Sequence, residues 1–189
     1  MNADADDARD ATASLLFDAA RRSAAYLGGL ERRSVRPSPT AVADLARLEM
    51  PLPEAPTDPA AVLAELDALV TPATMATAGP RFFGFVIGGT LPAALAANWL
   101  AAAWDQNAAM ASVTPGVAQV EAIALRWIVE VLGLPATTEG AFVTGATMAN
   151  FTALAAARHA VLARAGWDVA ADGLIGAPQV TVMTGEEAH

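Results

Sequence analysis

The chain has 189 residues, a formal net charge of −9 and no cysteine. The negative charge disfavours a nucleic-acid partner, and the missing cysteines exclude a disulfide framework, a thiolate nucleophile and a cysteine zinc site. All eleven basic residues are arginines, so the chain contains no lysine. Much of its hydrophobic content is alanine, which favours helices, and we therefore expect a helix-rich protein.

Membrane and metal sites are not expected either. The most apolar run, Leu91 to Trp104, is too short to cross a bilayer, and Asn98 interrupts it. The N-terminal residues are acidic where a secretory signal would be basic. His159 and His189 lie thirty positions apart, which is no recognisable metal-ligand spacing, and His159 is interpreted as a solvated surface residue. These features predict a cytoplasmic protein without a membrane partner.

Residues 1–75 are predicted to form a helical arm. Apolar and small residues recur along one side of residues 4–27. Prolines separate this helix from two further helical patterns, residues 40–48 and residues 58–70, and the latter opens with Asp58-Pro59, a good N-cap and first-turn pair. The apolar stripes have no partner within the arm, so they are expected to pack on another domain or another subunit.

Residues 76–189 are predicted to be the first part of an α/β domain. The expected elements, in chain order, are a loop over 79–89, helices over 92–104 and 115–132, the second capped by Thr114, a strand over 140–144, a helix over 148–164 and a strand over 179–184. The loop mixes aromatic residues with glycines that permit unusual dihedral angles, which gives it functional potential. A series of strand, crossover helix and strand predicts a parallel sheet.

The turn Gly145-Ala146-Thr147 is the strongest local signal of a binding site. A small-residue turn between a strand and a helix presents free backbone N–H groups and the positive end of the helix dipole, and both favour phosphate. The Thr147 hydroxyl adds a further donor. Alternatively, the small residues merely permit tight packing of strand on helix, and the turn alone leaves both readings open. It is neither a Walker A loop, which needs a lysine, nor a G-x-G-x-x-G fingerprint.

Residues 144–158, which read TGATMANFTALAAAR, resemble the phosphate-binding segment of the group II pyridoxal-phosphate (PLP) dependent amino-acid decarboxylases, the family of aromatic-L-amino-acid and glutamate decarboxylases. Three other segments are similar to this family in the same order. Residues 79–85 resemble its substrate-side loop, residues 114–127 the helix leading into its large domain, and residues 186–189 the end of the next strand. The resemblance implies an incomplete large domain of fold type I, like that of aspartate aminotransferase, over residues 76–189.

The resemblance also implies roles for individual residues. The turn of residues 145–147 binds the cofactor phosphate, and His189 stacks on the pyridine ring as the catalytic residue that exchanges protons with the substrate. Phe85 and Asn107 are candidate substrate contacts, although helix capping or surface polarity also accounts for Asn107. The Schiff-base lysine of the family is absent, which implies that the chain is an N-terminal fragment and inactive alone.

The implied function of the complete protein is decarboxylation of an L-amino acid by a homodimer whose active sites lie at the subunit interface. Val86-Ile87-Gly88 departs from the phenylalanine-proline-threonine pattern of the aromatic members, so the resemblance does not name the substrate. The alternatives are a PLP-dependent aminotransferase or carbon–carbon lyase, a non-catalytic phosphate- or nucleotide-binding domain, and a structural fragment without activity. Product analysis separates the enzymatic alternatives, because a decarboxylase releases carbon dioxide and an aminotransferase releases an oxo acid.

Overall fold

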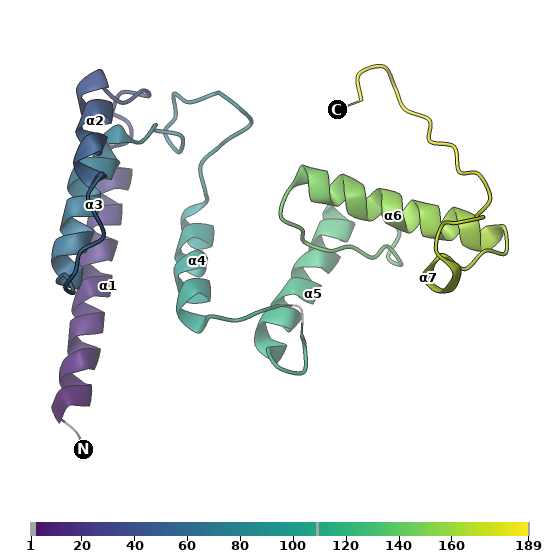
Figure 1. Cartoon of the computed structure of the whole chain (residues 1–189), viewed down its shortest axis with the longest axis horizontal. Helices are drawn as coiled ribbons and strands as arrows, with labels where there is room; N and C mark the ends of the chain where they lie inside the picture. The colour runs from purple at the N-terminus through teal and green to yellow at the C-terminus, as the bar shows by residue number, and fades with distance from the viewer. Residues whose placement is uncertain (1–2, 109, 189) are drawn as a thin grey trace. The chain divides into compact units, whose positions relative to one another are not determined.

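The computed structural model describes residues 3–108 and 110–188, and the regular secondary structure of these residues is helical (Figure 1). Its helices are α1 (Ala3–Gly29), α2 (Pro39–Asp44), the 3-10 helix η1 (Leu45–Leu48), α3 (Pro59–Ala73), α4 (Pro92–Trp104), α5 (Pro115–Val131), α6 (Ala146–Arg164) and α7 (Val169–Asp172). The chain divides into two compact units, residues 1–103 and residues 104–189, which we describe separately. The predicted division at residue 75 is not tested by this result and stays a prediction.

In the first unit, α1 and α3 pack against each other and run in the same direction (Figure 1). Arg22 of α1 pairs with Asp67 of α3 at 2.8 Å. Farther along both helices, the Thr74 hydroxyl donates to the Tyr26 hydroxyl at 3.3 Å. Because contacts advance together along both helices, the two are parallel, and both C-terminal ends lie at the same end of the arm.

Local chemistry fixes where the arm helices begin. The Asp58 carboxylate accepts hydrogen bonds from the amides of Ala60 (3.4 Å) and Ala61 (3.2 Å), and Pro59 occupies the first turn, where its missing N–H costs nothing. The hydroxyl of Ser38 caps α2 in the same way, again just before a proline. The predicted start of the third arm helix is therefore confirmed.

An ion-pair network joins α1 to α3. The Arg22 guanidinium donates to Asp18 (2.7 Å) and to Asp67 (2.8 Å), and the Thr71 hydroxyl donates to Asp67 (2.6 Å). The Thr71 hydrogen bond, and after it Arg22, lowers the pKa of Asp67. Hydrogen bonds from Arg22 and then Arg21 lower the pKa of Asp18. Folding therefore favours the ionised form of both carboxyl groups.

We expect the arm to lose stability as the pH falls below the ordinary aspartate range. A carboxyl whose pKa is lowered by folding adds stability above its unfolded pKa of about 4, and this is lost as the pH falls through the folded value. Asp67→Asn should flatten the dependence of the unfolding free energy on pH between about 5 and 2, as measured by urea unfolding followed by circular dichroism. Asp44→Asn, at an exposed aspartate of α2, is the control. Equal slopes for the two variants would contradict this role of Asp67.

In the second unit, the predicted strands over 140–144 and 179–184 are not formed. A strand is defined by hydrogen bonds to a neighbouring strand, and no such ladder occurs within the described residues. Residues 180–183 instead line an apolar groove of about 540 Å³ together with side chains of α6. The described chain is therefore helical, and the predicted α/β class is not shown by it.

Thr114 does not cap α5 as predicted. Its side chain makes no capping hydrogen bond, and its hydroxyl donates instead to the backbone carbonyls of Asn107 and of Met110 (3.1 Å). Thr114 is also buried, with 6% of its surface exposed. The hydroxyl thus closes the turn that precedes α5.

Few side chains of the described residues are buried. The buried hydrophobic residues are Leu30, Leu69, Ala76 and Leu162. Many large apolar side chains are instead exposed within their own unit, for example Trp127 (66% exposed) and Phe151 (67% exposed). Much of the apolar helix surface of each unit is therefore uncovered by that unit's own described residues.

Candidate phosphate-binding site

The turn at the start of α6 presents backbone donors without acceptors in the helix. Gly145 is the N-cap residue in an extended conformation, and its carbonyl accepts the first helical hydrogen bond from the amide of Ala149 at 3.0 Å. The amides of Ala146, Thr147 and Met148 precede that bond, so they have no acceptor within the helix. No side chain caps this end. Three N–H groups and the positive end of the helix dipole are therefore directed at one place.

The surroundings of this turn suit an anion. The first turn of α6 carries no acidic residue, although the chain as a whole has a charge of −9. Residues 141–150 are all exposed, and a Cβ built on Gly145 would meet no atom within 4 Å. Thr147 adds a hydroxyl in the same first turn. The donor set and the free space both fit a phosphate group, which is bound well at such helix ends.

The fit extends only to the phosphate end of a PLP molecule. A PLP enzyme also needs a lysine amine, and this chain has none. The turn is an open surface rather than a hollow. Two hollows of the chain lie elsewhere, one of about 530 Å³ among α1, α3 and α4 and one of about 750 Å³ beside α5. The turn therefore fits a phosphate group, and the chain offers no lysine for a covalent bond to the cofactor.

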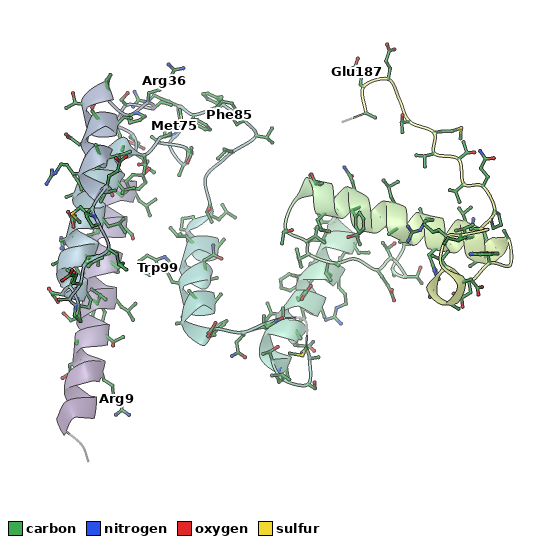
Figure 2. All side chains as sticks on the ribbon, in the orientation of Figure 1. Arg9, Arg36, Met75, Phe85, Trp99 and Glu187 are labelled. Atoms are coloured by element: carbon green, nitrogen blue, oxygen red, sulfur yellow. The ribbon has the colours of Figure 1, made fainter. Side chains whose placement is uncertain are left out.

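The other predicted site residues are distributed along the chain. Phe85 lies in the first unit, on the segment between α3 and α4 (Figure 2), and it is 83% exposed. Asn107 lies in the second unit, in the turn closed by Thr114. His189 lies outside the described residues. The structure thus brings together the three residues of the phosphate turn, on a single helix end.

Phe85 and Val86 both adopt left-handed backbone conformations, with φ of 57° and 55°. Such angles are uncommon for non-glycine residues and are a genuine outlier for a β-branched residue such as valine. Strain of this kind costs about 1–3 kcal/mol per residue and clusters at functional sites. The backbone conformation of this segment is therefore a second reason, besides its sequence, to consider it a functional segment.

Residues 42–189 match the family described as the pyridoxal-dependent decarboxylase conserved domain. The chain belongs to this family. Pyridoxal phosphate is accordingly the cofactor of the family, and the match includes the whole α6 turn. The predicted membership in the group II PLP decarboxylases is confirmed.

Named relatives of this chain agree with the family match. Tryptophan decarboxylase 1 of Oryza sativa subsp. japonica is 29% identical over 98% of this chain and 37% of its own length. Aromatic-L-amino-acid decarboxylase of Bacillus atrophaeus is 33% identical over 61% of this chain and 24% of its own length. The crystal structure of Oryza sativa TDC with PLP and tryptamine superposes with a TM-score of 0.71 at 26% identity, over 90% of this chain and 35% of that one. The chain thus spans roughly a third or less of the relatives it matches.

Two other kinds of site are not found in the part of the chain that the structure describes. None of its described helices is both long and apolar enough to span a bilayer. Within the same residues, no three His, Asp or Glu side chains gather in a way that could hold a metal ion.

The sequence did not single out a polar cluster at the end of the arm where α1 and α3 both finish. The Arg33 guanidinium donates to the carbonyls of Thr71 and Thr74 and lies over the Tyr26 ring, 5.0 Å from its centroid. Arg33 is 38 residues from Thr71 and 41 residues from Thr74 in the sequence, so no periodic pattern reveals these contacts. The available signal is weak: an arginine that follows a helix-ending glycine can cap a neighbouring helix.

Proposed function

We propose that this chain is the N-terminal part of a PLP-dependent enzyme that decarboxylates an L-amino acid, and that the turn at the start of α6 binds the cofactor phosphate. One observation carries the proposal. The segment that matches the decarboxylase family includes a helix end with three free N–H groups, no acidic residue in its first turn and open space in front of it. When bound, PLP supplies an electron sink for the charge left at the α-carbon as carbon dioxide departs.

The residues of this chain have distinct proposed roles in that reaction. The amides of residues 146–148 and the Thr147 hydroxyl hold the phosphate and so fix where the pyridine ring lies. His189 stacks on that ring, and its imidazole nitrogen holds or releases a proton close to neutral pH. Phe85 and Asn107 contact the substrate. The lysine that binds the cofactor covalently comes from protein beyond these 189 residues.

The exposed apolar surface of this chain supports the proposal that it is part of a longer protein with a partner subunit. Exposed apolar side chains such as Trp127 and Phe151 leave faces that further protein can cover. The relatives are roughly two and a half to three times as long as this chain, so a longer protein has further residues that can cover these faces. We therefore propose a homodimer of the longer protein, with the active site at the subunit interface.

The function is tested by product analysis of the purified longer enzyme, offered a panel of aromatic and non-aromatic L-amino acids. Carbon dioxide and the corresponding amine, in equal amounts, are the expected products. An oxo acid without carbon dioxide would identify an aminotransferase instead. Competition of PLP binding by a nucleotide, with no turnover, would identify a non-catalytic phosphate-binding domain.

Thr147→Val is expected to weaken PLP binding to the longer enzyme, because it removes a hydroxyl donor while nearly conserving side-chain volume. The expected cost is on the order of 1–3 kcal/mol, equivalent to about a 5- to 150-fold rise in the PLP dissociation constant. The measurement is PLP titration of the apoenzyme followed by absorbance. Thr152→Val makes the same chemical change on an exposed threonine farther along α6 and should bind PLP as wild type does. Equal affinities for the two variants would remove Thr147 from the phosphate site.

A further inference from the structure

Residues 78–89 form a closed loop whose two ends touch. A Cβ built on Gly89 would lie 3.3 Å from the carbonyl oxygen of Ala78, so the chain returns to its starting point after leaving the arm. Two turns shape the interior, with hydrogen bonds from the amide of Phe82 to the carbonyl of Gly79 (3.3 Å) and from that of Ile87 to that of Gly84 (3.1 Å). Compact closed loops of this length are frequently functional.

Backbone contacts attach the start of this loop to the arm. The amide of Ala76 donates to the carbonyl of Val35 at 3.0 Å, and Ala76 itself is 1% exposed. A Cβ built on Gly79 would lie 3.1 Å from the Ala76 oxygen and 3.5 Å from the Leu30 oxygen, so the Gly79 backbone approaches both carbonyls closely. The start of the loop therefore rests on the residues that follow α1.

Arg81 adds a charged attachment from within the loop. Its guanidinium donates to the backbone carbonyl of Arg33, and a hydrogen bond from a charged donor is roughly twice as strong as a neutral one. The Arg33 guanidinium in turn donates to the Thr71 carbonyl, the Thr74 carbonyl (3.3 Å) and the Thr74 hydroxyl (3.2 Å). We call this series, from the loop through Arg33 to the end of α3, the arginine link.

The far side of the loop is apolar and open. The exposed fractions are 92% for Phe83 and 83% for Phe85, and Val86 is fully exposed. Phe85 and Val86 hold the left-handed angles described above, a conformation that needs support from the surrounding structure. Figure 2 shows Met75, Phe85 and Arg36 at the same end of the arm, where the loop leaves α3.

We infer that Arg81 is a positioning residue that holds the loop of residues 78–89 on the arm through the arginine link, so that Phe85 is presented to the substrate in a fixed orientation. The inference rests on the proposed function for the substrate contact of Phe85. The attachment itself rests on the hydrogen bonds and close approaches of Arg81, Arg33 and Gly79. Arg81 acts through the backbone and touches neither substrate nor cofactor.

Hydrogen exchange of the 189-residue chain, measured by mass spectrometry, tests the attachment. Arg81→Ala should raise exchange about tenfold in peptides covering residues 76–88, whose bonded amides depend on the attached loop, and leave α5 peptides unchanged. Arg81→Lys keeps the charge without the planar fork and should restore part of the protection. Arg36→Ala, at an exposed arginine beside the same end of the arm, should exchange as wild type does. Unchanged exchange in Arg81→Ala would overturn the inference.

Steady-state kinetics of the longer holoenzyme test the positioning. Arg81→Ala should raise KM for the amino acid about tenfold, with kcat and PLP content within about twofold of wild type, and Arg81→Lys should recover part of the loss. An unchanged KM alongside faster loop exchange would overturn the positioning role. A wild-type holoenzyme without decarboxylase activity would instead remove the proposed function, and the exchange result would still decide whether Arg81 holds the loop.

Discussion

Incubation of the 189-residue chain with PLP, followed by borohydride reduction, is expected to leave no pyridoxyl group on any side chain and to release no carbon dioxide from any amino acid. PLP enzymes hold their cofactor covalently through a lysine amine, and all eleven basic residues here are arginines. A guanidinium stays protonated at every accessible pH and cannot replace that amine as a nucleophile. Peptide mapping by mass spectrometry locates any adduct, and trapping of labelled carbon dioxide measures turnover.

Any label on the chain is expected at the N-terminal amine, which is its remaining primary amine. Acetylation of that amine before the incubation is the control and should remove the label. Carbon dioxide release by the 189-residue chain alone would contradict the assignment of catalysis to a longer protein that contains a lysine.

Leu162→Ala is expected to destabilise the second unit by about 2–5 kcal/mol, because it removes a large side chain from a site that is 1% exposed. Leu162 lies near the end of α6, and its carbonyl accepts the amide of Trp167 at 2.9 Å. The Trp167 indole donates to the carbonyl of Gly173 at 2.9 Å, so the same region joins α6 to α7. Urea unfolding followed by tryptophan fluorescence measures the loss.

Val161→Ala is the matched control, since its side chain is a neighbour on α6 but is 47% exposed. The expected loss is within about 0.5–1 kcal/mol of wild type. Equal losses for the two variants would show that Leu162 is not a core residue of this unit. Because α6 carries the phosphate turn at its other end, the same measurements report how firmly that turn is supported.

Several helix starts could be predicted because their causes are local, whereas α6 begins at Ala146, two residues before the predicted residue 148. Asp58 accepts amides two and three positions ahead, and the proline beside it is preset for the first turn. The bounds of α4 match the predicted residues 92–104, which begin at a proline. The free amides of the turn follow from the position of Gly145 before a helix. The short helix α7 was missed, although Asp168 caps it with the same local chemistry.

Other features depend on contacts between distant parts of the chain. Arg33 meets residues of α3 that lie 38 to 41 positions away, and Arg81 meets the Arg33 carbonyl across 48 positions. The predicted strands over 140–144 and 179–184 need neighbouring strands that the described residues do not supply. Their apolar patterns alone therefore could not show whether strands would form. Arrangements of this kind cannot be read from spacing alone.

The parallel packing of α1 and α3 sets an order of events during protein synthesis. Arg22 cannot meet Asp67 until 45 further residues have been made, which takes about 2–9 s at 5–20 residues per second. Most of the stability of a helix in a protein comes from tertiary packing, and α1 is without its packing partner α3 during that interval. Slow codons between these two positions would lengthen the wait, and fast codons would shorten it.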